Sequence, residues 1–130
     1  MPEIDWEQLL REGADAYNRG DWDGVLTQAA DDIVLVRAPS APEGRALVEG
    51  KAAVLEFFRP NVLSEQRLEL LEFTQREDTF LAKMKFSARG AGSDLPVSLI
   101  AFLVYFMKDD LLTRIEIHND EAPAIAAAGL

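Results

Sequence analysis

The stretch LPVSLIAFLVYFMKDDLLTRIEIHN, residues 95–119, decides the fold. It predicts two long strands, 95–108 and 111–119, joined by a tight turn of two aspartates. The first strand is apolar at both alternating positions, which is typical of a strand buried on both faces. The second strand alternates between apolar and polar residues, as a strand with one wet face does. One face of this hairpin must therefore be covered by helices from elsewhere in the chain.

Composition places the chain among soluble globular proteins. With 130 residues, 48% of them hydrophobic and 28% charged, we expect one domain, residues 1–130. The net charge of −10 disfavours nucleic acids and anionic membranes as partners. The absence of cysteine excludes a thiolate nucleophile and a cysteine metal site. With no signal-peptide pattern and no run of about 18 apolar residues, we expect a cytoplasmic protein that does not enter a membrane.

Helix signals dominate the first half of the chain. Asp5 is a good N-cap for a helix whose apolar residues recur up to Tyr17, and Gly20 is a good C-cap. A second, short helix is predicted to begin at Asp21, and a third follows Gly50. These three helices are expected to lie on one face of the sheet.

Strand signals dominate the second half. After a short strand at 33–38 and a loop at 39–49, we expect strands at 67–74 and 79–89 before the hairpin. The apolar positions switch parity between Leu70 and Leu71, which suggests a β-bulge. A last helix, 121–128, would be capped by Asp120. The predicted class is α+β, with a curved, mainly antiparallel sheet and a conical cavity under the helices.

Several strings resemble one known family. They are YNRGDWDGVL at 17–26, ADD at 30–32, Phe57-Phe58 in the helix after Gly50, and the end of the chain from residue 114. They resemble SnoaL-like proteins of the nuclear-transport-factor-2-like (NTF2-like) superfamily, which includes ketosteroid isomerases. The resemblance implies an NTF2-like cone with its helices on the concave face, and dimers that pair through the outer face of the sheet. It does not imply one activity, because the superfamily includes isomerases, cyclases, hydrolases, dehydratases and binding proteins.

Ketosteroid isomerase chemistry is not expected. Those relatives carry a tyrosine, an aspartate base and a second acid in the cone, and the resemblance places Gly13, Ala38 and Phe102 at these positions. Proton abstraction needs a base within about 3 Å of the proton and a donor for the developing oxyanion. None of the three residues supplies either.

Arg114, Glu116 and His118 share one face of the last strand and allow two interpretations. They could form a proton-transfer cluster around the only histidine in the chain, or a salt-bridged face at a dimer contact. The resemblance favours the second, because it matches the residues of opposite parity, Ile115 and Ile117, to the pocket. One histidine cannot make a metal site, and we expect no metal or cofactor.

Three functions remain open from the sequence. The first is an apolar pocket that binds a hydrophobic small molecule. The second is an enzyme of the same fold, and the third is a dimeric interaction module whose cone is filled by its own side chains. The wall expected for the pocket is Val34, Val36, Ala38, Phe57, Phe58, Ile100, Phe102, Val104, Ile115 and Ile117. Candidate catalytic residues are Tyr17, Tyr105, Glu116, His118 and Asp120, with Asn119 beside them.

A homodimer is also predicted. Ala101, Leu103 and Tyr105 share one face of their strand, while Phe102 and Val104 share the other. Helices on one side of a sheet leave the other side open, and large exposed apolar patches are uncommon on soluble monomers. The sequence therefore predicts that a second copy covers the outer face.

Overall fold

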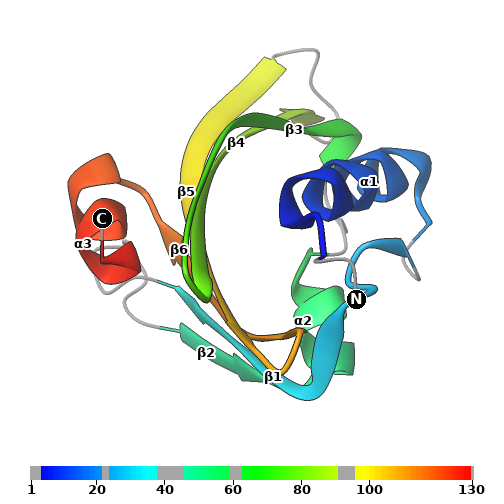
Figure 1. Cartoon of the computed structure of the whole chain (residues 1–130). Helices are drawn as coiled ribbons and strands as arrows, with labels where there is room; N and C mark the ends of the chain where they lie inside the picture. The colour runs from blue at the N-terminus through cyan, green and yellow to red at the C-terminus, as the bar shows by residue number, and fades with distance from the viewer. Residues whose placement is uncertain (1–3, 22–23, 38–45, 59–62, 91–95, 130) are drawn as a thin grey trace.

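The computed structural model describes residues 4–21, 24–37, 46–58, 63–90 and 96–129 (Figure 1). Helices and strands follow one another as α1 (Trp6–Arg19), β1 (Ala29–Arg37), β2 (Ala46–Glu49), α2 (Lys51–Phe58), β3 (Leu63–Arg76), β4 (Thr79–Gly90), β5 (Pro96–Lys108), β6 (Leu111–His118) and α3 (Glu121–Ala128). The expected α+β class is confirmed.

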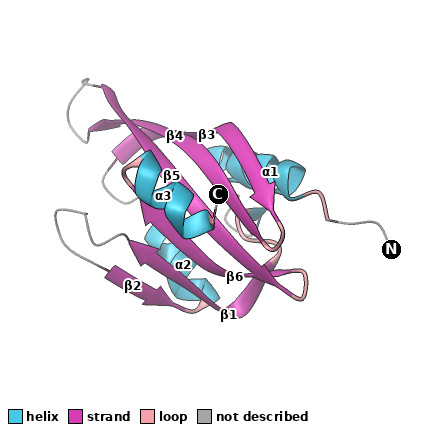
Figure 2. Ribbon diagram, turned by 60° about the vertical axis from the view of Figure 1, so that its left-hand side comes forward, coloured by secondary structure: helices cyan, strands magenta, loops and turns pink. Residues whose placement is uncertain are grey.

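The six strands form one curved sheet in the order β2-β1-β6-β5-β4-β3. β1 and β6 run parallel, and the other neighbours are antiparallel. Figure 1 shows the sheet wrapping around α1 and α2, while α3 lies outside the curve. In Figure 2, α3 crosses β4 and β5 on the side opposite to α1 and α2. The sheet therefore has a concave face under α1 and α2 and a convex face under α3.

The β5–β6 hairpin occupies the middle of the sheet, as its apolar sequence requires. Its turn residues, Asp109 and Asp110, have φ values of 53° and 64°. Two successive residues with positive φ are typical of the type I′ turn, which aspartate tolerates and which suits the twist of a two-residue hairpin.

Both ends of α1 are capped as predicted. The Asp5 carboxylate accepts a hydrogen bond of 3.0 Å from the backbone N–H of Gln8. Gly20 has a φ of 76°, the left-handed conformation of a helix C-cap. The buried side of α1 faces the sheet and packs mainly against β3. α1 therefore forms the roof over the concave face.

The second expected helix is not an α-helix in the described residues 24–28: Gly24 has 3₁₀ conformation, and residues 25–28 form turns that lead into β1. Gly24 lies so close to α1 that a Cβ atom there would come within 2.8 Å of the Ala16 Cβ. The backbone of Gln28 accepts a hydrogen bond of 2.8 Å from the N–H of Leu112 in β6. Packing against α1 and pairing with the sheet therefore replace the helix. In the loop expected at 39–49, residues 46–49 form β2, and 39–45 lie outside the described residues.

Within the described residues, the register of the sheet shifts at four places, and two of these bulges bear on the predicted strands. The register of β3 against β4 shifts between Leu70 and Glu72, which confirms the predicted bulge. The second bulge was not predicted. On β5, Met107 pairs with Leu112 but Phe106 pairs with Arg114, so Thr113 is an extra residue in β6. The Thr113 hydroxyl donates a hydrogen bond of 3.2 Å to the Phe106 carbonyl.

The core has two parts. The larger lies between the concave face, α1 and α2, and includes Ile33, Leu35, Val54, Phe80 and Ile115. The smaller joins Val104 of β5 to Ala124 and Ala128 of α3 on the convex face. No helix within the described residues has the length and hydrophobicity that crossing a bilayer requires.

Candidate ligand-binding cavity

A cavity of about 420 Å³ lies between α1 and the concave face of the sheet. Most of its lining is aliphatic or aromatic. The polar residues among the described lining are Tyr17, Thr27, Arg37, Tyr105 and Asn119. Sites for small organic molecules commonly combine such an apolar wall with a few polar groups.

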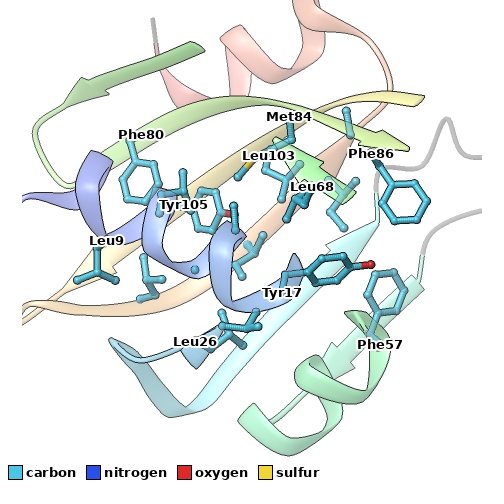
Figure 3. A pocket seen from close by; sticks show the side chains of 18 of the residues that line it. Leu9, Tyr17, Leu26, Phe57, Leu68, Phe80, Met84, Phe86, Leu103 and Tyr105 are labelled. Atoms are coloured by element: carbon cyan, nitrogen blue, oxygen red, sulfur yellow. The ribbon is translucent and has the colours of Figure 1, made fainter. Parts of the chain in front are cut away.

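The cavity has a closed end and an open end. Around the closed end, Phe80 is 1% exposed and Tyr105 is also buried. At the other end Leu99 is 49% exposed, and Asn119 is exposed as well. Figure 3 shows Phe80 and Tyr105 at one end and Phe57 and Phe86 at the other. A ligand would therefore enter beside Leu99 and Asn119 and reach toward Phe80.

Stacked aromatic rings fix the closed end. The ring centroids of Phe80 and Tyr105 are 4.6 Å apart with an interplanar angle of 19°. Trp6 and Phe73 lie against Phe80 at centroid distances of 5.9 Å and 5.1 Å. Because these rings are packed on one another, the Tyr105 side chain is held in one orientation.

The Tyr105 hydroxyl is a buried polar group in apolar surroundings. Burial raises the pKa of Tyr105 far above its ordinary value of 10.0, so the hydroxyl keeps its proton. Within the described residues it makes no hydrogen bond, although its ring lines the cavity. It can therefore act as a donor inside the cavity, but not as a base at neutral pH.

Tyr17 and Arg37 bring polar groups toward the open end. The Tyr17 hydroxyl points toward Phe57 and Phe86 (Figure 3), and partial burial raises its pKa. The Arg37 guanidinium lies 5.3 Å from the centroid of the Phe57 ring, within cation–π range. Arg37 is the one residue with a formal charge in the described lining, which contains no carboxylate.

Some of the residues expected at the pocket do line this cavity. Tyr17 and Tyr105 reach it from α1 and β5, Phe57 from α2, and Ile115 and Ile117 from β6. Ala38 and the side chain of Phe58 lie outside the described residues.

The expected facing of β5 is wrong. Ile100, Phe102 and Val104 are absent from the lining, and Phe102 and Val104 belong to the cluster packed under α3. The residues of the other parity face the cavity instead. These are Leu99, Ala101, Leu103 and Tyr105.

The unpredicted bulge at Thr113 causes this reversal. An uninterrupted hairpin would pair Val104 with Ile115, and directly paired residues share a face. With the extra residue, Ile115 pairs with Tyr105. The bulge therefore turns Tyr105 toward the cavity and Val104 toward α3.

The expected facing of β1 is also wrong. Val34 and Val36 do not line the cavity, while Ile33 and Leu35 lie in the larger core. Leu35 pairs with Ile115 of the parallel strand β6, so the two residues share the concave face. Arg37, two residues further along β1, was not expected at the cavity, because nothing in an apolar strand marks its last residue as inward-facing.

Glu116 and His118 lie on the convex face, away from the cavity. Arg114 Nε is 2.8 Å from Glu116 Oε2, and His118 Nε2 is 3.2 Å from Glu116 Oε1. His118 is only 8% exposed, and its Nδ1 atom is buried without a hydrogen-bond partner in the described structure. These three residues form a connected polar cluster on β6, in the middle of the sheet.

Asp120 precedes α3 and is exposed, and its side chain makes no capping hydrogen bond. It does not line the cavity. Within the described ranges, no three histidine, aspartate or glutamate side chains are grouped so as to hold a metal ion. The catalytic candidates are therefore divided between two faces of the sheet, with only the tyrosines and Asn119 at the cavity.

Comparison with solved structures places this architecture among NTF2-like proteins. An NTF2-like protein of unknown function from Burkholderia pseudomallei is 21% identical, with a TM-score of 0.75 over 98% of this chain and 100% of that one. TerC co-crystallised with polyporic acid is 20% identical, with a TM-score of 0.73 over 94% of this chain and 95% of TerC.

A third similar structure is RV0760c from Mycobacterium tuberculosis in complex with estradiol-17beta-hemisuccinate. It is 15% identical, with a TM-score of 0.69 over 89% of this chain and 94% of that one. No curated protein sequence matches the chain. The model of the SnoaL-like domain matches residues 10–115, which include most of α1, all of α2 and most of the sheet. The chain therefore belongs to the SnoaL-like domain family.

Proposed function

We propose that this protein binds a hydrophobic small molecule in the cavity under α1. The observation that carries the proposal is the space of about 420 Å³ between α1 and the sheet, with its mainly apolar wall. Ligand pockets commonly have volumes of about 300–1,000 Å³. An interaction module whose cone is filled by its own side chains would not leave such a space.

The ligands of two similar structures support the proposal. TerC was crystallised with polyporic acid, and RV0760c was crystallised with estradiol-17beta-hemisuccinate. Those proteins share the fold with this chain at low sequence identity. Their ligands therefore suggest the size and the hydrophobic character of a ligand for this chain, but do not identify the compound.

Binding is favoured over catalysis by the side chains at the cavity. General-base chemistry needs a group that accepts a proton near neutral pH. The described lining offers Tyr17 and Tyr105, whose raised pKa values keep them protonated, and no carboxylate or histidine. We therefore propose a binding protein, with an enzyme that uses the tyrosines as hydrogen-bond donors as the second candidate.

A thermal-shift screen of apolar metabolites tests the proposal. A ligand at 100 times its Kd stabilises the folded state by about 2.7 kcal/mol. The blocking variant is Ala101→Phe, which places a ring in the cavity from the middle of β5. The matched control is Ile100→Phe, which adds bulk on the convex face of the same strand.

We expect ligands to raise the melting temperature of the wild type and of Ile100→Phe, but not that of Ala101→Phe. Two results would contradict the proposal. One is a screen without any stabilising ligand. The other is a ligand that stabilises folded Ala101→Phe as much as it stabilises the wild type.

We also infer a homodimer through the convex face. By the pairing of the strands, Leu47, Val36, Glu116, Val104 and Leu81 lie in one row across it. α3 covers the row at Val104, while Leu47 is 56% exposed. The dimer would still use the outer face of the sheet, but on β5 that face carries Phe102 and Val104, whereas residues 101, 103 and 105 face the cavity.

A further inference from the structure

The Tyr105 hydroxyl is a polar group of the cavity lining whose hydrogen-bonding capacity the described residues do not use. Its ring is fixed by stacking on Phe80, and the cavity lining includes the aliphatic Leu26, Leu103 and Leu112. A buried hydroxyl without a partner costs free energy, which a hydrogen-bonding ligand can recover. The feature therefore concerns what enters the cavity rather than what holds the fold together.

We propose that Tyr105 makes the cavity selective for apolar molecules that carry a carbonyl oxygen, which accepts a hydrogen bond from its hydroxyl. This inference rests on the proposed function and adds the chemical class of the ligand.

The protonation state of Tyr105 favours an acceptor on the ligand. Because burial raises its pKa, the side chain is a neutral phenol that offers an O–H group at every physiological pH. A carbonyl oxygen accepts this bond and brings no donor of its own. A ligand hydroxyl would bring a further hydrogen that needs an acceptor, and neither the Phe80 ring stacked on Tyr105 nor the side chain of Leu103 supplies one.

The position of Tyr105 adds an orientation to this selectivity. Tyr105 lies at the closed end, whereas Arg37 lies over Phe57 at the other end and Asn119 is an exposed residue of the lining. A molecule whose carbonyl reaches Tyr105 must place its apolar body along α1 and its other end beside these polar side chains. The ligand should therefore enter with the carbonyl first.

Three probes of nearly equal shape test the inference: fluorene, 9-fluorenone and 9-fluorenol. Each is measured by equilibrium dialysis against the full chain, Tyr105→Phe and Thr79→Val. Tyr105→Phe removes only the hydroxyl and keeps the stacked ring. Thr79→Val is the control, because it removes a hydroxyl at the neighbouring position to Phe80, on the other face of β4.

We expect Tyr105→Phe to bind 9-fluorenone about fivefold to tenfold more weakly than the wild type does. On binding, the carbonyl oxygen gives up its hydrogen bonds to water, and in the variant it finds no donor to replace them. Fluorene should bind Tyr105→Phe at least as well as it binds the wild type, and Thr79→Val should bind all three probes like the wild type. In the infrared spectrum, the C=O stretch of bound 9-fluorenone should lie lower in the wild type than in hexane. This second measurement needs no variant.

Two results would overturn the inference while leaving the proposed function intact. One is that Tyr105→Phe changes the affinities for fluorene and 9-fluorenone by the same factor. The other is that the wild type binds 9-fluorenol more tightly than 9-fluorenone. If none of the three probes binds the wild type, apolar binding itself fails, and the inference fails with it.

Discussion

Asn18, in the last turn of α1, binds both backbone groups of Leu68 in β3. Its Nδ2 donates to the Leu68 carbonyl at 3.0 Å, and its Oδ1 accepts from the Leu68 N–H at 2.7 Å. β3 is at the edge of the sheet, so these two groups have no neighbouring strand to pair with. One amide side chain thus takes the place of a strand and attaches α1 to the sheet beside the cavity, which Leu68 also lines.

We predict that Asn18→Ala lowers the free energy of unfolding by about 1–3 kcal/mol, because two partly buried backbone groups lose their partner. Urea denaturation measures the change. The control is Gln8→Ala on the same helix, whose side chain bonds only Glu12 at the exposed surface. Its cost should stay within about 0.5 kcal/mol. Equal costs for the two variants would show that the clamp on Leu68 does not stabilise the fold.

How much of the cavity the sequence can predict depends on the strand. β6 alternates, so its apolar residues Ile115 and Ile117 are distinguishable from the polar face without a structure. β5 is apolar on both faces, because one covers the cavity and the other lies under α3. Only the pairing of β5 with β6 decides which face of β5 lines the cavity. That pairing depends on the single extra residue Thr113. Threonine is common in regular strands, so nothing in the sequence marks the bulge.

The helices also differ in how far the sequence predicts them. α1 is predictable, because its caps and its periodicity agree. The turns at 24–28 are not, because their apolar residues recur at helical spacing. Tertiary contacts decide there: Gly24 fits against Ala16, and Gln28 bonds to Leu112. Propensity over so few residues is a weak force compared with such contacts.

Tyr105→Phe should stabilise the ligand-free protein. Removing a buried hydroxyl that has no hydrogen-bond partner among the described residues recovers about 1 kcal/mol, while the stack on Phe80 is retained. The melting temperature should rise by about 3–5 °C. A lower melting temperature would mean that the hydroxyl contributes to the fold, for example through an ordered water molecule.

The same variant should change the stability at alkaline pH. The pKa of Tyr105 is raised on folding, so the unfolded chain ionises first, at its ordinary value of 10.0. The ionisation of Tyr105 therefore leaves the free energy of unfolding unchanged below about pH 10.0 and lowers it as the pH rises toward the higher folded pKa. We expect the wild type to lose stability more steeply than Tyr105→Phe between about pH 9 and pH 11. Tyr17 remains in both proteins, so the difference between the two curves belongs to Tyr105.

The convex face should hold a second copy of the chain. Light scattering at micromolar concentration should give the mass of a dimer, twice 14.4 kDa. Leu47→Lys should shift the mass toward the monomer, because a charge would be buried in the contact. Leu111→Lys is the control, since Leu111 is an exposed leucine at the hairpin turn. A monomeric wild type would exclude the dimer at that concentration.

The unmodified protein should not isomerise a 3-keto-Δ5 steroid. Tyr105 offers one hydrogen-bond donor, but the described lining contains no carboxylate that could abstract the proton. A positioned general base is worth about 10²–10⁴-fold in rate. Gly13 brings no side chain to the cavity, and Ala101 and Leu103, the cavity-facing neighbours of Phe102, are apolar. The enone absorbance of the product measures turnover, and activity that Ala101→Phe abolishes would show that a base had been missed.

His118 should support the sheet rather than the ligand. It is almost completely buried on the convex face, next to Glu116, and the sheet separates it from the cavity. His118→Ala removes a packed ring and one partner of the Glu116 carboxylate, which keeps its contact with Arg114. We therefore predict a loss of about 1–2 kcal/mol in the free energy of unfolding. A weaker dimer should accompany it if the convex face is the contact.

Ligand affinity is the measurement that separates the two roles of His118. Because Ile117 and Asn119 face the cavity, the residue between them must face away, and the Kd of His118→Ala should stay within about twofold of the wild type. Glu116→Gln is the matched variant, since it keeps the shape of the partner and removes its charge. Combined with His118→Ala, it should show a coupling of about 0.5–1 kcal/mol in stability and none in ligand binding. If His118→Ala instead abolishes binding while the melting temperature and the mass stay unchanged, the histidine acts on the ligand.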